Sequence, residues 1–123
     1  MRWIVDGMNV IGSRPDGWWR DRHRAMVTLV ERLESWRSHG DDVTVVFERP
    51  PEPPIDSSAV TVAYAPHPAP NSADDEIVRL VRADDRPGDI SVATSDRTLA
   101  ERVREAGASV VSAERLRELI DPR

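Results

Sequence analysis

Short runs of β-branched and other apolar residues alternate along this chain with longer segments in which apolar residues recur every three or four positions. Runs of the first kind are typical of buried strands, and the second periodicity is typical of amphipathic helices. The predicted strands cover residues 3–5, 43–47, 60–64, 90–94 and 109–111. Because strands that alternate with helices pair in parallel through crossover connections, the pattern predicts an α/β fold with a mainly parallel sheet of about five strands.

The helices are predicted from the same periodicity and from the residues at their ends. The clearest helix covers residues 18–39, and Gly40 is placed to cap its end. The segment that opens at Ser72 resembles a capping box, which predicts the start of another helix. Two further helices are expected over residues 97–106 and 113–120.

The composition excludes several classes of chemistry. The 123 residues suffice for one domain, which we expect to span residues 1–123. All 17 basic residues are arginine, so no lysine is present for a Schiff base or a Walker-type phosphate loop, and no cysteine is present for a thiolate site. The net charge of −5 argues against a protein that coats nucleic acid in general, but it does not exclude a local basic patch.

Acidic residues follow three of the predicted strands. Asp6 follows the first strand, where Asp6-Gly7 is typical of a tight turn, Glu48 follows the second and Asp96 the fourth. In a doubly wound sheet, ligands bind at the carboxyl ends of strands, where the strand order reverses. If the first and fourth strands are neighbours, the ends that carry Asp6 and Asp96 lie about 5 Å apart. Such oxygen ligands suit Mg²⁺ or Mn²⁺, which would activate water and stabilise displacement at a phosphodiester.

Asp74 is a further candidate ligand, for a different reason. On its predicted helix it shares a stripe with Ile77, so its carboxylate is expected to point inward near the helix N-terminus. Asp75 is expected to turn toward Arg79 and Arg82. Each acid alone has an ordinary explanation as a turn residue, a helix cap or a partner of the helix dipole. Their joint placement at one predicted sheet edge favours a metal site.

Four segments of the chain carry a more specific pattern. They are Val5-Asp6-Gly7-Met8-Asn9-Val10-Ile11-Gly12, Val45-Val46-Phe47-Glu48, Ser72-Ala73-Asp74-Asp75-Glu76-Ile77 and Val92-Ala93-Thr94-Ser95-Asp96-Arg97. In this order they resemble the PIN-like nuclease superfamily, and more closely its NYN branch of YacP-like proteins. The resemblance implies a PIN-like three-layer α/β/α sandwich and a metal-dependent ribonuclease, an endonuclease that uses Mg²⁺ or Mn²⁺.

The resemblance also implies roles for individual residues. It places the metal-binding, catalytic carboxylates at Asp6, Asp74 and Asp96. It adds Asn9 and Ser95 as supporting polar groups, and Asp75 and Glu48 are expected to support the site as well. Many proteins of that branch carry Asp where this chain has Glu48, and the proline-rich residues 50–55 replace a longer connection, so that Arg49 is the only base there.

Positive charge and flat rings gather in the segment after Asp6. The residues concerned are Arg14, Trp18, Trp19, Arg20, Arg22 and Arg24. Arginine binds phosphate and tryptophan stacks on bases, so this segment is expected to hold single-stranded RNA. A structural alternative has equal weight: one tryptophan packs on the core while the arginines pair with Asp16 and Asp21.

Two functions besides the ribonuclease remain open at this point. The same cleft would suit a module that binds RNA or a ribosomal partner without chemistry, and a PIN-type toxin shares the fold that the resemblance implies. An aspartate at position 6 and the lack of a long apolar run predict neither a leader nor a membrane span, hence a cytoplasmic protein. The RNA target and the oligomeric state do not follow from the sequence.

Overall fold

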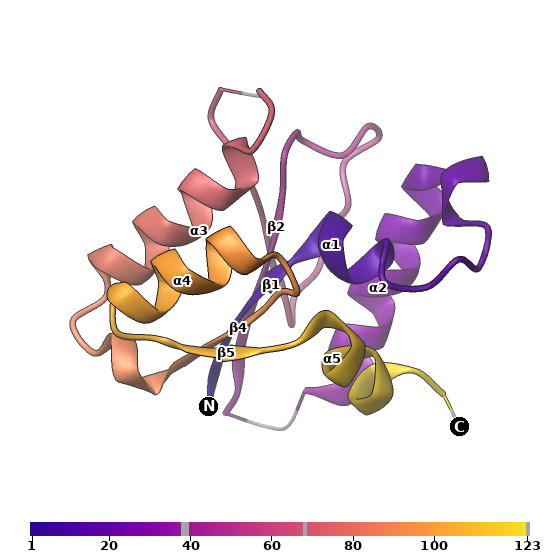
Figure 1. Ribbon diagram of the computed structural model, residues 1–123. Coiled ribbons are helices and arrows are strands. Elements are labelled where there is room, and N and C mark those ends of the chain that lie inside the picture. Colours follow the sequence, from indigo (N-terminus) through magenta and orange to yellow (C-terminus); the bar gives the residue numbers. More distant parts are fainter. Residues whose placement is uncertain (38–39, 68, 123) are drawn as a thin grey trace.

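The computed structural model describes residues 1–37, 40–67 and 69–122, and a parallel sheet forms its centre (Figure 1). The strands are β1 (Arg2–Asp6), β2 (Asp42–Phe47), β3 (Thr61–Tyr64), β4 (Ile90–Ala93) and β5 (Ser109–Val111). Their order is β3-β2-β1-β4-β5, and every neighbouring pair is parallel. The predicted α/β class is confirmed, and the strand order reverses between β1 and β4, which are neighbours.

Helices cover both faces of the sheet and complete the predicted three-layer sandwich (Figure 1). On one face lie α3 (Ser72–Ala83) and α4 (Arg97–Glu105), and on the other α1 (Gly7–Ile11), α2 (Arg22–Trp36) and α5 (Ala113–Ile120). Two apolar clusters fill the space between layers; Leu33 and Leu116 belong to one, Ile77 and Leu99 to the other. No helix within the described ranges is long and apolar enough to cross a membrane.

The tight turn expected at Asp6-Gly7 is a short helix instead. β1 ends at Asp6, and α1 begins at Gly7. Gly7 lies against β2, where a Cβ atom would sit 2.5 Å from the Phe47 ring and 3.1 Å from the Val46 carbonyl oxygen. The missing side chain therefore lets α1 start directly on the sheet, with Asp6 at the junction of strand and helix.

The long helix predicted over residues 18–39 is divided near its start. Gly17 has a φ of 89°, and a separate 3₁₀ turn, η1 (Trp18–Arg20), follows it. Asp21 then caps α2, because its side chain accepts a hydrogen bond from a backbone N–H of the first turn. The aromatic and basic segment therefore belongs to a turn and a helix start, not to one continuous helix.

The caps predicted for two helices differ from those in the structure, although one of these helices does begin at Ser72 as predicted. α2 ends at Trp36, before Gly40, and residues 38 and 39 lie outside the described residues. α3 begins at Ser72, so Asn71, with a φ of 64°, and not Ser72 occupies the cap position. The Ser72 hydroxyl accepts a hydrogen bond from the preceding loop and makes no capping box.

A buried arginine in the last helix holds α1 in place. Arg117 is 6% exposed and donates to the carbonyl oxygens of Val10 at 3.2 Å and Ile11 at 3.4 Å, at the end of α1. It also binds Asp121 at 2.9 Å and Asp16 at 3.0 Å. All three guanidinium nitrogens are engaged, so α5 is tied both to α1 and to the loop that follows it.

Candidate functional site

A cavity of about 260 Å³ opens where β1, β2, α3 and the start of α4 meet at the carboxyl edge of the sheet. Its polar lining consists of Asp6, Asn9, Glu48, Asn71, Asp74 and Asp96. The structure thus brings the three strand-end acids together with Asp74, whereas Asp75 does not line this cavity. No basic side chain of the described residues lines it either. We call it the carboxylate cavity.

Asp6 is the most deeply buried acid of the carboxylate cavity, at 6% exposed, because β1 is the central strand and α1 covers its end. Its Oδ2 atom accepts a hydrogen bond from the Thr94 hydroxyl at 2.8 Å. Burial, and to a lesser extent the charges of the other three carboxylates, raises the pKa of Asp6 from 3.8 to about 7, although the Thr94 hydrogen bond lowers it. A nearby cation would therefore favour the ionised carboxylate strongly.

Thr94 connects Asp6 to Asp96 across the pair of strands where the order reverses. Besides donating to Asp6, its Oγ1 atom accepts a hydrogen bond from the Asp96 N–H at 3.1 Å. Asp96 in turn caps α4, since its Oδ1 atom accepts from the Leu99 N–H at 2.9 Å. The ordinary explanation of Asp96 as a helix cap thus holds for one carboxylate oxygen, while its side chain still lines the carboxylate cavity.

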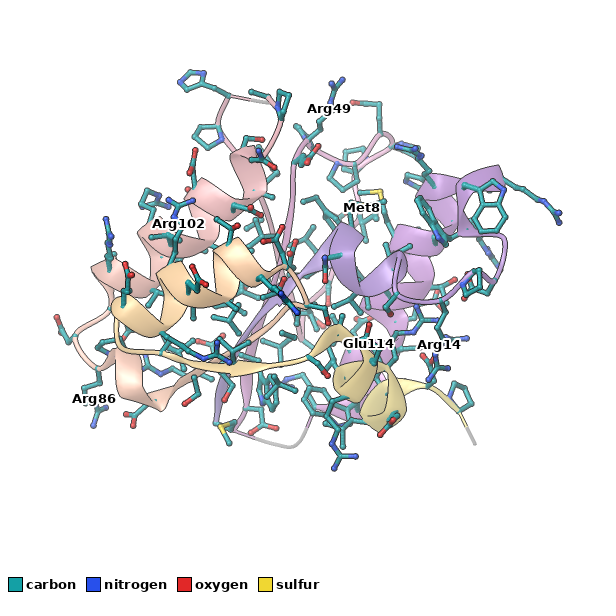
Figure 2. The ribbon with its side chains drawn as sticks, viewed as in Figure 1. Met8, Arg14, Arg49, Arg86, Arg102 and Glu114 are labelled. Atoms are coloured by element: carbon teal, nitrogen blue, oxygen red, sulfur yellow. The ribbon has the colours of Figure 1, made fainter. Side chains whose placement is uncertain are left out.

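The two supporting groups Asn9 and Ser95 occupy different places. Asn9 lines the carboxylate cavity, and its Oδ1 atom accepts a hydrogen bond from the Ser95 backbone N–H at 2.9 Å. The Ser95 hydroxyl instead donates to Glu114 at 2.7 Å and accepts from the Ala113 N–H at 2.9 Å, at the start of α5 where Figure 2 labels Glu114. The hydroxyl beside the acids is therefore that of Thr94, which the sequence did not single out, and Ser95 anchors the surrounding helices.

Asp74 and Asp75 face different surroundings in the first turn of α3. Asp74 is half-buried in the carboxylate cavity; burial, followed by the charge of Asp96, raises its pKa, and the charge of Arg102 lowers it. Asp75 is exposed and binds Arg102 of α4 at 3.0 Å, not the arginines of its own helix such as Arg79. Arg102 thus brings a positive charge beside Asp74 from the helix layer on the left of Figure 2.

The donor set of the carboxylate cavity fits a hard divalent cation. It consists of carboxylate and amide side chains, and Mg²⁺ and Mn²⁺ prefer oxygen ligands. Over the described part of the chain, no three acidic or histidine side chains are arranged to hold a metal ion directly. The acids stand around a cavity, where like charges repel one another. In proteins, Mg²⁺ keeps several of its waters and is usually held by only one or two carboxylates.

The buried acid determines how the stability of the metal-free protein is expected to depend on pH. Because folding raises the pKa of Asp6 from 3.8 to about 7, the native state binds this proton more tightly than the unfolded chain. The contribution of Asp6 to the free energy of unfolding should therefore fall as the pH rises from about 4 to about 7, by as much as roughly 4 kcal/mol. Urea denaturation in EDTA at a series of pH values measures this fall.

A Thr94→Val variant provides the matched comparison for this pH dependence. It removes the hydrogen bond that lowers the pKa of Asp6, so the fall in stability should extend to higher pH than in the wild type. Identical pH profiles for the two proteins would contradict the coupling between Thr94 and Asp6.

The arginines of the predicted RNA-binding segment fall into two groups. Arg14 lies beside α5, where its guanidinium binds Asp121 at 2.6 Å (Figure 2). Arg20, Arg22 and Arg24, in contrast, form no ion pair with any residue that the structure describes. The arginines of η1 and the start of α2 therefore have no ion-pair partner in the part of the chain that the structure describes.

The structural alternative is correct for one tryptophan but not for the arginines. Trp18 packs against the core, whereas Trp19 is 50% exposed and contacts the Trp18 ring edge-on at 5.9 Å. The Arg22 guanidinium lies over the Trp18 ring, 5.5 Å from its centre. Asp16 binds a buried arginine of α5 and Asp21 caps α2, so neither pairs with the arginines of this segment.

Comparisons with known proteins place this geometry in a family. The family model of the YacP-like NYN domain matches residues 3–122. Among solved structures, the chain is similar to Rae1 (YacP) from Bacillus subtilis, at 29% sequence identity and a TM-score of 0.78, over 97% of this chain and 73% of that one. A mutant of the same Bacillus subtilis protein gives 28% identity and a TM-score of 0.78, over 96% of this chain and 74% of that one. The search of curated proteins finds no match. Because the family model spans nearly all of the sequence, this chain belongs to the YacP-like NYN domain family.

Proposed function

We propose that this protein is a metal-dependent endoribonuclease that hydrolyses phosphodiester bonds in single-stranded RNA. The observation that carries the proposal is the carboxylate cavity, in which Asp6, Asp74 and Asp96 gather at the reversal of strand order without a basic side chain from the described residues. Converging, partly buried acids are unfavourable at neutral pH unless a cation offsets their charge. The nuclease-like fold of the family supports the same conclusion.

Each of the three acids is positioned by a different part of the fold. Asp6 is held by the Thr94 hydroxyl, Asp96 by its cap of α4, and Asp74 by the first turn of α3. Together they would hold Mg²⁺ or Mn²⁺, which when bound supplies activation of water and neutralises charge on the phosphate. Glu48 is an exposed residue of the cavity lining, and its carboxylate would orient entering water.

Positive groups stand on several sides of the path that RNA would take to the carboxylate cavity. Arg102 lies near Asp74, and Arg49 extends from the loop after β2 (Figure 2). Beyond α1 stand Arg20, Arg22 and Arg24, while the ion pair with Asp121 holds Arg14 beside α5. The exposed ring of Trp19 is available for stacking on an unpaired base, which favours single-stranded RNA over a duplex.

Cleavage of an unstructured RNA tests this function. The wild type should cleave it in Mn²⁺ or Mg²⁺ and should be inactive in EDTA. Asp74→Asn should lower the rate by at least about 100-fold, because a ligand of the ion is lost. Asp75→Asn makes the same chemical change one residue away, outside the carboxylate cavity, and should keep most of the activity. Equal losses in the two variants would contradict the assignment of Asp74.

One observation favours a second function. Within the described residues the acids are not arranged to hold a metal directly, which would suit a module that binds RNA or a ribosomal partner without chemistry. That function predicts RNA binding unchanged by EDTA and no cleavage with any divalent ion. A PIN-type toxin would cleave RNA as proposed here and would be distinguished by growth arrest on expression.

A further inference from the structure

A second cavity lies beyond the other end of α1 and shares no lining residue with the carboxylate cavity. It has a volume of about 250 Å³ and opens between η1, α2 and α5; we call it the η1 cavity. Apolar groups of Ile11, Trp18, Leu29 and Ile120 contribute to its lining. Cavities that bind drug-sized ligands measure about 300–1,000 Å³, so this one is suited to a single small ring system.

Some charged residues of the η1 cavity lining pair with one another. Arg32 and Arg117 line the cavity with Asp121, which binds Arg32 at 2.8 Å and Arg117 at 2.9 Å. Arg117 uses its remaining nitrogens for Asp16 and for carbonyl oxygens of α1. The hydrogen bonds of these groups are already made within the protein.

Two other arginines of the η1 cavity lining have no ion-pair partner among the described residues. Arg20 and Arg24 line the cavity from η1 and the first turn of α2, and neither forms an ion pair with a described residue. Asp21 lines it as well, but its carboxylate accepts the Arg24 N–H at 3.0 Å as the cap of α2. The cavity therefore offers two guanidinium groups beside an aromatic and apolar floor.

We propose that the η1 cavity binds one nucleobase, with the adjacent phosphate held by Arg20 and Arg24. A base presents flat rings that stack on tryptophan, and its phosphate matches the guanidinium groups in charge and geometry. Met8 and Asn9 line the carboxylate cavity while Ile11 lines the η1 cavity, so one RNA strand can follow α1 from one cavity to the other. The inference rests on the proposed function and adds a base-binding site away from the cleavage site.

RNA binding measured without cleavage tests this inference. A fluorescent, unstructured RNA oligonucleotide is titrated with protein in EDTA. Arg24→Gln removes one guanidinium, and Thr28→Phe adds a ring to the cavity lining without changing its charge. Each should weaken binding by about tenfold or more, as for the loss of one stacked base or one charged phosphate contact. Arg82→Gln is the control, since it removes an exposed arginine from the last turn of α3 and should bind like the wild type.

Binding of adenosine and uridine monophosphates shows whether the ligand of the η1 cavity is a free nucleotide or a base within an RNA strand. A monophosphate that binds the wild type but not Thr28→Phe supports the site with a free nucleotide as its ligand. Binding of RNA alone, weakened by the same substitution, supports it with a base of the strand. If Thr28→Phe fails to fold, an oligonucleotide with abasic positions tests the site with the wild type instead. This abasic RNA should bind the wild type about tenfold more weakly than intact RNA does.

Two results separate this inference from the proposed function. Unchanged RNA affinity in Arg24→Gln and Thr28→Phe, both folded by circular dichroism, would overturn the η1 cavity as a base site; cleavage by the wild type would then still support the nuclease. Abasic RNA that binds as tightly as intact RNA would overturn it as well. If the wild type binds RNA through the η1 cavity but fails to cleave it in the presence of any divalent ion, the result would contradict only the proposed nuclease activity.

Discussion

An Asp6→Asn variant should lose at least about three orders of magnitude in the rate of metal-dependent RNA cleavage and should be more stable than the wild type at pH 8. The loss of rate follows from the place of Asp6, buried at the end of the central strand and oriented by Thr94. The gain in stability follows from its pKa of about 7, because at pH 8 the metal-free wild type holds a charged carboxylate in a site that favours the protonated form.

Asparagine isolates this charge, because it keeps the shape of aspartate and still accepts the Thr94 hydrogen bond. At pH 8 in EDTA the gain should approach about 4 kcal/mol at most, and it should shrink at pH 5, where wild-type Asp6 is largely protonated. Urea denaturation and cleavage assays in Mn²⁺ measure the two effects. Asp42→Asn, an exposed position at the other end of β2, should change neither. If Asp6→Asn cleaves RNA at the wild-type rate, the proposal that Asp6 holds the metal ion would be contradicted.

Arg117→Met should lower the free energy of unfolding by roughly 3–5 kcal/mol, as expected when one partner of a buried ion pair is removed. Methionine keeps much of the length of arginine but donates no hydrogen bond. The carbonyl oxygens of Val10 and Ile11 would lose a donor, and the nearly buried Asp121 would lose one of its partners. Because α1 carries residues of both cavities, the variant should also weaken RNA binding at temperatures where it remains folded.

Arg115→Met is the matched control for Arg117→Met. Arg115 lies in the same helix, but its side chain is 61% exposed and binds Glu118 at 3.1 Å on the surface. An exposed pair of this kind contributes about 0–1 kcal/mol, so the control should unfold nearly as the wild type does. Urea denaturation at pH 7 compares the two variants. Similar losses of stability in both would mean that the buried network contributes little.

The strands could be predicted because burial on both faces of a parallel sheet selects runs of β-branched residues, as in residues 43–47. α1 could not be predicted, since five residues give no helical period and Asp-Gly is a common turn signal. The contact that decides its start, the Phe47 ring against Gly7, joins residues from separate elements. The division of residues 18–39 is local in origin: the positive φ of Gly17 and the cap at Asp21 set η1 apart from α2.

Asp6, Glu48 and Asp96 of the carboxylate cavity could be located from topology, because the carboxyl ends of parallel strands share one edge, whereas Asp74 was located from its helical spacing. Which hydroxyl lies beside the acids, that of Thr94 or that of Ser95, could not be predicted, since neighbouring residues in extended backbone point to opposite sides. It depends on the register of β1 and β4, in which Val5 pairs with Ala93, so that the next residues, Asp6 and Thr94, come together. That register is set by packing across the sheet and is not encoded in either strand alone.

The burial of Arg117 could have been predicted from the helical spacing of α5, although its charge argues for an exposed position. Positions 113, 116 and 120 form the buried stripe of α5, and position 117 completes its helical spacing. A charged residue on such a stripe indicates a buried group with partners, because an unpaired buried charge is strongly unfavourable. The partners themselves, two carbonyl oxygens of α1 and Asp16, come from distant parts of the chain and needed the structure.

The parallel sheet also gives the molecule a far side that is convenient for attachment. All strands start at the edge opposite the carboxylate cavity, and the turn η2 (Pro87–Asp89) leads into β4 at that edge. Gly88 in this turn is exposed, and a Cβ atom there would meet nothing within 4 Å. Because the sequence contains no cysteine, Gly88→Cys would create a single thiol. A surface tether coupled to this thiol would hold every molecule with the carboxylate cavity facing away from the surface.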